Sequence, residues 1–144
     1  MNKKNKILIL CTGNSCRSQM AEGFLKSFDS ELEVYSAGTN PSGSVHPKAI
    51  QVMKELNLDI SVGYPQHVDD FIDKDFDYVI TVCGGAKESC PMFAGKVKKQ
   101  LHIGFDDPAE ATGTEDQILD EFRRVRDEIK RGFNSFYNNN IKKY

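Results

Sequence analysis

The sequence predicts an α/β fold, a three-layer sandwich built on a four-stranded parallel sheet. Four short apolar runs alternate with segments whose apolar residues recur at helical spacing. The runs are apolar on both faces, as in parallel strands that are covered on both sides. No internal repeat or long linker divides the 144 residues, so we expect a single domain over residues 1–144.

The predicted strands comprise residues 6–10, 33–36, 77–82 and 100–105, and the third is rich in β-branched and aromatic residues. Parallel strands end at the same edge of their sheet, and open α/β sheets bind their ligands there. Cys11, Cys83 and the run 106–108, "DDP", follow the first, third and fourth strands. We therefore expect these three features to meet on one rim.

The predicted helices comprise residues 17–29, 46–57, a short piece near 67–73, and a long last helix. Pro47 suits the first turn of the second helix. Thr114 and Gln117 have the spacing of a capping box, and apolar residues then recur every three or four positions as far as Phe136. The tail "NNNIKKY" is expected to fray.

Composition and charge exclude several classes of protein. The net charge of −2 gives no sign of a nucleic-acid or membrane partner, and no apolar run is long enough to cross a bilayer. The apolar run near the N-terminus is too short for a signal peptide. We therefore expect a cytoplasmic monomer with reduced cysteines, and their spacing does not match a zinc site.

The loop after the first strand has the composition of an oxyanion cradle. It contains a C-x5-R-S pattern between a strand and a helix N-terminus, where backbone N–H groups converge and the helix dipole adds positive potential. Arg17 offers a planar fork, and the same field favours a Cys11 thiolate to which Ser18 could donate. Cys11 is thus a candidate nucleophile. The residues of the loop between Cys11 and Arg17 are Thr12, Gly13, Asn14, Ser15 and Cys16.

Two simpler interpretations of these residues stay open. In the first, Cys11 is an ordinary buried cysteine at a strand end and Arg17 is a surface residue. In the second, Asp107 is a turn residue before Pro108. Cys16 is expected to sit in the loop wall without an essential role. The three histidines are expected to be structural or exposed.

The chain resembles a known family. C-x5-R-S followed far downstream by "DDP" is similar to the low-molecular-weight protein tyrosine phosphatase superfamily. Within it, "CTGNSCRSQMAEG", "VYSAG", "HPKAI", "GFDDPA" and "FRRVRDEI" resemble the thioredoxin-coupled arsenate reductases, from about residue 6 to 131. The resemblance implies that Cys11 attacks the oxyanion, that Arg17 binds it, and that Asp107 is the general acid for the departing oxygen. Arsenate, phosphate or sulfate would occupy the cradle.

The resemblance also implies a redox relay in arsenic detoxification. Cys83 would attack the Cys11–arsenic adduct, release arsenite and leave a Cys11–Cys83 disulfide, and Cys90 would then form Cys83–Cys90 for thioredoxin to reduce. If residues 83–90 are helical, seven residues rise ~10.5 Å, more than a disulfide spans, so we expect the segment 83–91 to refold.

Two alternatives to the reductase remain at this point. One is a small tyrosine phosphatase that uses Cys11, Arg17 and Asp107, although Ala109 and Glu110 stand where such enzymes usually carry an aromatic residue. The other is a thiol-based sensor without turnover. No tightly bound cofactor is expected. The resemblance implies a potassium ion near Asn14, Glu22, Ser36 and Asp70, with Asp69 as the alternative to Asp70.

Overall fold

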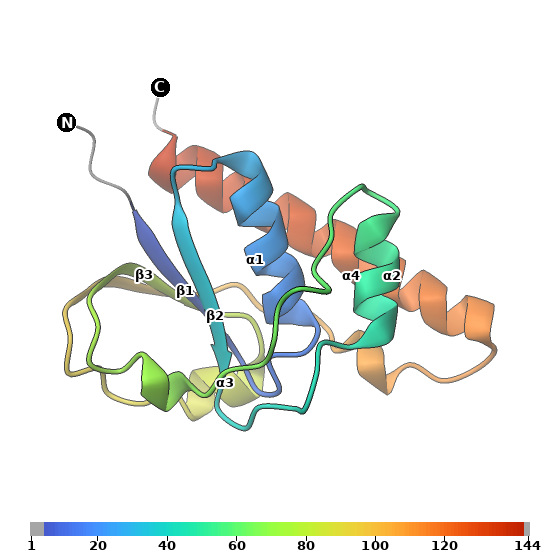
Figure 1. Ribbon diagram of the computed structural model, residues 1–144, viewed down its shortest axis with the longest axis horizontal. Helices are drawn as coiled ribbons and strands as arrows, with labels where there is room; N and C mark the ends of the chain where they lie inside the picture. The colour runs from blue at the N-terminus through green and yellow to red at the C-terminus, as the bar shows by residue number, and fades with distance from the viewer. Residues whose placement is uncertain (1–4, 143–144) are drawn as a thin grey trace.

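The computed structural model describes residues 5–142 and contains the predicted four-stranded parallel sheet (Figure 1). The strands are β1 (Lys6–Cys11), β2 (Glu33–Gly38), β3 (Phe76–Thr81) and β4 (Val97–His102), in the order β2-β1-β3-β4. β1 lies inside the sheet between β2 and β3, and its residues 7–10 are completely buried. The terminal residues 1–4 and 143–144 of the predicted domain lie outside the described part.

The position of the fourth strand was wrong by three residues. β4 begins at Val97, which pairs with Phe76, and not at Gln100. Its residues are mostly exposed because it is an edge strand, so the apolar pattern pointed instead to the chain that follows it. That chain stays beside β3, because the amides of Ile103 and Phe105 donate to the carbonyl groups of Thr81 and Val82 at 2.9 and 3.1 Å.

The helices agree with the apolar pattern, except that the piece near 67–73 is only a short turn and that the helix over residues 84–88 was not predicted. They are α1 (Arg17–Phe28), α2 (Pro47–Lys54), α3 (Gly84–Glu88) and α4 (Glu115–Phe136), with short 3-10 turns η1 (Val68–Asp70) and η2 (Pro108–Glu110). The capping box of α4 is confirmed, since the Thr114 and Gln117 side chains each accept a hydrogen bond from the other residue's backbone amide. The tail was wrong in part: residues 137–141 continue α4 as the π-helical turn η3 (Tyr137–Ile141).

Helices and turns cover the two faces of the sheet. α1 packs against β1, β2 and α4, and α2 packs against α4, so these helices lie together on one side (Figure 1). An aromatic cluster joins the sheet to η1 and to the segment that follows α3, with ring centroids 5.7–6.3 Å apart. Its members are Tyr35, Phe71, Phe76 and Phe93. Within residues 5–142, no helix is both long and apolar enough to cross a membrane.

Candidate active site

Three strand ends bring the predicted site residues to one edge of the sheet. β1 ends at Cys11, β3 ends two residues before Cys83, and Asp107 lies in the chain that leaves β4. The thiols of Cys11 and Cys83 are hydrogen-bonded to each other. Arg17, the first residue of α1, reaches Asp107 at 3.5 Å between Nη2 and Oδ2. Residues far apart in the sequence therefore form one site.

The loop from Cys11 to Arg17 is held with its carbonyl groups facing away from the site. Four of these groups accept hydrogen bonds from the amides of the segment 39–46, at N···O distances of 2.8–3.2 Å. Since a peptide's N–H and C=O point in opposite directions, this arrangement turns the loop's N–H groups toward its concave side. The four acceptors are Cys11, Thr12, Gly13 and Ser15.

Asn14 fixes the curvature of the loop. Its φ of 52° lies in the left-handed region, which asparagine tolerates better than most residues. Its buried amide Nδ2 donates to Ser18 Oγ at 2.7 Å and to Ser36 Oγ at 2.9 Å, and its Oδ1 accepts from the Gln66 amide at 2.9 Å. These bonds tie the loop to α1, to β2 and to the chain before η1.

Arg17 carries an unsatisfied donor inside the site. Its Nη1 donates to the Phe105 carbonyl at 3.0 Å, and Nη2 faces Asp107, but the buried Nε has no acceptor among the described residues. A buried donor without a partner costs about 1–3 kcal/mol, so such groups are usually satisfied by a ligand or water. An oxyanion oxygen in the cradle would satisfy this one.

Cys11 and Cys83 titrate as a hydrogen-bonded pair, in which the pKa of Cys83 is lowered and the pKa of Cys11 is raised. The hydrogen bond from Cys11 is the largest cause that lowers the pKa of Cys83, to about 4, with further contributions from Thr12 Oγ1 at 3.3 Å and the Ala86 amide at 3.4 Å. The bond to Cys83 and burial raise the pKa of Cys11. The charge of Arg17 and the backbone amide of Thr12 lower the pKa of Cys11, as expected of the loop, but the bond to Cys83 and burial outweigh them.

The remaining cysteines are neutral thiols in this state. Burial, and then the charge of Asp107, raise the pKa of Cys16 to about 12. Burial also raises the pKa of Cys90. Cys83 caps the N-terminus of α3 and Cys90 lies two residues beyond its C-terminus, so the helical part of this segment is shorter than residues 83–90.

Asp107 lies at the rim beside the cradle. Its Oδ1 accepts from the Ala109 amide at 3.0 Å, which holds the carboxylate in a turn, and its Oδ2 faces Arg17. The side chain is 31% exposed, so it can exchange protons with solvent. Ser18, by contrast, is fully buried, and no hydrogen bond joins it to Cys11 among residues 5–142.

The residues predicted near a cation are only partly assembled. Ser36 Oγ donates to Glu22 Oε1 at 2.5 Å and accepts from Asn14, so these three side chains form one chain of oxygen and amide groups. Asp69 and Asp70 are exposed on η1, and within the described residues neither bonds to that chain. No group of three or more His, Cys, Asp or Glu side chains in residues 5–142 is placed to hold a metal.

Several supporting residues were missed by sequence reasoning. The Gln19 side chain donates a hydrogen bond to the Asn14 carbonyl at 3.1 Å, and the backbone amide of Gln66 donates one to the Asn14 side chain. Thr12 was predicted only as a loop residue, yet its hydroxyl contacts Cys83. These contacts join segments that are distant in sequence, and no local pattern indicates them.

Comparisons with known proteins agree with this geometry. The family model for low molecular weight phosphotyrosine protein phosphatase matches residues 6–144. An arsenate reductase of Bacillus subtilis is 48% identical over 135 residues, covering 92% of this chain and 96% of the relative. One from Staphylococcus aureus is 50% identical over 141 residues, covering 94% of this chain and 98% of the relative.

Solved structures give the same result. An arsenate reductase in its phosphate-binding state superposes with a TM-score of 0.79 at 33% identity, covering 94% of this chain and 98% of the other. A low-molecular-weight tyrosine phosphatase from T. tengcongensis has a TM-score of 0.77 at 23% identity, over 94% of this chain and 99% of the other, which shows a common fold. The chain therefore belongs to the low-molecular-weight protein tyrosine phosphatase family, on the branch that contains the bacterial arsenate reductases.

Proposed function

We propose that the protein reduces arsenate to arsenite through successive disulfides of Cys11, Cys83 and Cys90, and that thioredoxin restores the thiols. The observation that carries this proposal is the hydrogen bond between Cys11 and Cys83 at an oxyanion cradle. Ester hydrolysis needs one sulfur in the cradle, whereas a two-electron reduction needs a second within bonding reach. The names of the relatives support the same activity.

The first step is attack by Cys11 on arsenic. Loop N–H groups and Arg17 hold the arsenate oxygens, and moving one proton along the hydrogen bond to Cys83 ionises Cys11 without a change in net charge. The Cys11 thiolate then forms a sulfur–arsenic bond while an arsenic–oxygen bond breaks. Asp107 gives the departing oxygen a proton, which makes water the leaving group.

The second step transfers two electrons. Cys83 attacks the sulfur of Cys11, the sulfur–arsenic bond breaks, and its electron pair stays on arsenic, which leaves as arsenite. The Cys83 proton passes to an arsenite oxygen, since arsenite departs as a weak acid. Thr12 and the Ala86 amide support this step because they stabilise the Cys83 thiolate.

The third step needs movement of α3. The Cys90 thiolate attacks Cys83, forms the Cys83–Cys90 disulfide and expels Cys11 as a thiolate. Cys83 and Cys90 lie at opposite ends of α3, roughly 10 Å apart along a helix, whereas disulfide Cα atoms lie within about 7 Å. α3 must therefore unwind, and the loss of the Cys83 thiolate as its N-cap favours that. A dithiol reductant such as thioredoxin, near −270 mV, then restores both thiols.

The chemistry of the Glu22–Ser36–Asn14 cluster fits a bound potassium ion. Glu22 and Ser36 offer oxygens, which suit a hard cation, and one of them is a carboxylate, whereas Asn14 turns Nδ2 toward Ser36 and would have to present its oxygen instead. Lys26 Nζ already lies 2.5 Å from Glu22 Oε2, so an ion there would share the carboxylate with a lysine. We propose that Glu22, Ser36 and Asn14 would hold such an ion. It would stabilise the loop by neutralising the charge of the Glu22 carboxylate.

Hydrolysis of phosphate esters is the second candidate, because the same cradle binds phosphate. The structure offers little to recognise an aryl group after the general acid: Ala109 and Glu110 are exposed on η2 and neither is aromatic. We therefore expect weak phosphatase activity beside the reductase.

The test couples arsenate reduction to thioredoxin and NADPH oxidation. It compares the parent with Cys83→Ser and Cys90→Ser, with Cys16→Ser as the matched control, and measures p-nitrophenyl phosphate hydrolysis beside it. Both relay variants should lose arsenate turnover and keep any phosphatase activity, while Cys16→Ser keeps both. Arsenate turnover that survives in both relay variants would overturn the relay.

A further inference from the structure

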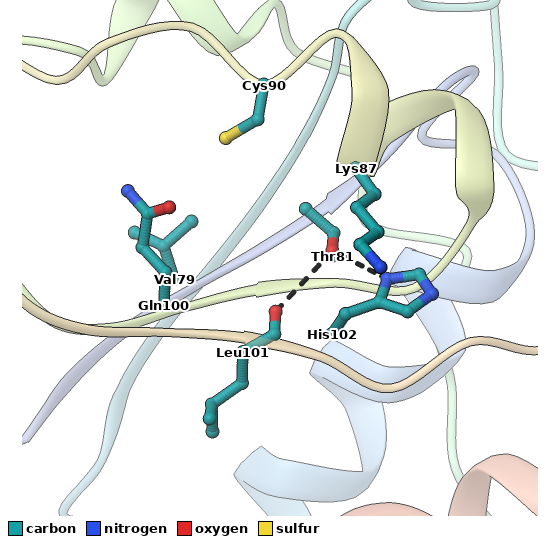
Figure 2. A pocket seen from close by; sticks show the side chains of 7 residues that line it. All are labelled: Val79, Thr81, Lys87, Cys90, Gln100, Leu101 and His102. Carbon is teal, nitrogen blue, oxygen red and sulfur yellow. Dashed lines mark hydrogen bonds between the residues drawn. The ribbon is translucent and has the colours of Figure 1, made fainter.

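A cavity of about 200 Å³ lies between the α3 segment and the face of β3 and β4. Figure 2 shows Cys90 above it, with Lys87 on the same segment and His102 on the strand below. A neighbouring cavity of about 490 Å³ is also lined by Lys87 and Cys90. The third thiol of the relay therefore faces a hollow rather than the oxyanion cradle.

Lys87 is the only charged side chain in either lining, among the described residues. His102 is the other titratable partner of Cys90 there, and β3 and β4 otherwise contribute uncharged side chains. No carboxylate of the described chain lines these cavities to oppose a negative sulfur. A Cys90 thiolate would therefore find a cation and no anion beside it.

Lys87 and Cys90 are three residues apart across the end of α3. Residues at this spacing are neighbours on a helical turn, and the intervening Ser89 keeps a near-helical backbone, with φ −98° and ψ 10°. Lys87 is exposed and has a flexible four-carbon stem. Its ammonium group can therefore reach the sulfur by a change of rotamer.

In the resting state the ammonium group is turned away from the sulfur. Figure 2 shows the Lys87 side chain extending away from the Cys90 sulfur, on the side of His102, whose Nδ1 lies 2.8 Å from Thr81 Oγ1. Burial then acts alone on Cys90 and raises its pKa. A smaller fraction of Cys90 is therefore thiolate in this state than for a fully exposed cysteine.

We propose that Lys87 is a positioning residue for the third thiol, and that its ammonium group stabilises the Cys90 thiolate during its attack on the Cys11–Cys83 disulfide. This inference rests on the proposed relay. Cys90 loses its proton to solvent, its sulfur bonds to that of Cys83, and Cys11 leaves as a thiolate, so no external oxidant is needed. Lys87 moves with Cys90 when α3 unwinds, whereas His102 stays on β4.

The test measures the pKa of Cys90 when it is the sole thiol. In a Cys11→Ser/Cys16→Ser/Cys83→Ser protein, the rate of alkylation by monobromobimane is followed against pH. Because the ammonium group can turn to the sulfur once Cys90 ionises, Lys87→Met should raise the apparent pKa by about 0.5–1 unit, Lys87→Glu by roughly twice that, and Lys87→Arg should restore the parent value. Lys99→Met, on β4 and outside both linings, is the matched control and should change nothing.

A second measurement uses the protein with all its cysteines. After one turnover with arsenate, thiols are trapped with N-ethylmaleimide and the disulfides are mapped by mass spectrometry. Lys87→Met should slow formation of Cys83–Cys90 by about 2–5-fold at neutral pH, because a lower thiolate fraction is partly offset by greater nucleophilicity, and the deficit should shrink at higher pH. Phosphatase activity should stay unchanged.

The outcomes separate this inference from the relay itself. An unchanged Cys90 pKa in both Lys87→Met and Lys87→Glu overturns the role of Lys87 and leaves the relay intact. Arsenate turnover that survives in both Cys83→Ser and Cys90→Ser overturns the relay whatever the value of that pKa. A pKa that Lys87→Arg fails to restore also counts against an electrostatic role, because arginine keeps the charge.

Discussion

Replacing Thr12 by valine tests the charge assignment in the cysteine pair. The substitution keeps the shape of the side chain and removes one of three donors to Cys83, the others being Cys11 and the Ala86 amide. A hydrogen bond to a charged group contributes about 1.5–3 kcal/mol, and the lower end applies here because the oxygen–sulfur distance is 3.3 Å. At 1.36 kcal/mol per unit, the pKa of Cys83 should rise by about one unit from about 4.

The effect of Thr12→Val on activity depends on which protonation state of Cys83 reacts. The thiolate is the reactive form, so a higher pKa removes activity on the acid side and leaves the rate at pH 7 almost unchanged. The assay is thiolate absorbance at 240 nm against pH, in a Cys16→Ser/Cys90→Ser background, where the first ionisation of the pair is observed. Thr12→Ser keeps the hydroxyl and should titrate like the parent. If Thr12→Val also titrates like the parent, Thr12 does not stabilise the Cys83 thiolate.

Three further substitutions test other parts of the structure. Asp107→Asn should lower arsenate turnover about 10²–10⁴-fold in the thioredoxin assay while phosphate still binds, because a proton donor is lost but the cradle is kept; an unchanged rate would exclude Asp107 as the acid. Arg126→Met should lower the free energy of unfolding by about 1–3 kcal/mol in urea titrations, since buried Arg126 Nη1 bonds the Val52 carbonyl and Glu55; equal midpoints would contradict this. Potassium should raise the melting temperature more than sodium at equal ionic strength, and Glu22→Gln should abolish the difference; an unchanged difference would exclude Glu22 as a ligand.

The sequence predicted the fold because its signals are local. The capping box at Thr114 and the apolar spacing of α4 are read within one segment, and the structure contains both. The strand β4 was misplaced because an edge strand lacks the buried face that would mark it. Phe105 misled the prediction, since it stacks on Phe133 at 6.2 Å from a loop rather than from a strand.

The chemistry of the site was predicted in outline but not in its charge distribution. The loop pattern indicates an oxyanion cradle, because its small residues and arginine stand together in sequence. Which sulfur holds the proton depends on Thr12, Ala86 and Cys83 meeting in space, and these residues come from two separate strand ends. The exposed position of Asp70 likewise depends on the path of the chain before η1, which no motif fixes.

The outward-facing carbonyl groups of the loop have a consequence for discrimination between ions. Because folding alone keeps the cradle open, a tetrahedral anion would meet a finished shape, and phosphate and arsenate have nearly the same shape. The shape of the cradle alone would then not exclude phosphate, and the two ions would compete for it. In the proposed relay the two ions would be distinguished at the later redox step, because arsenic(V) accepts two electrons from a pair of sulfurs whereas phosphorus(V) does not.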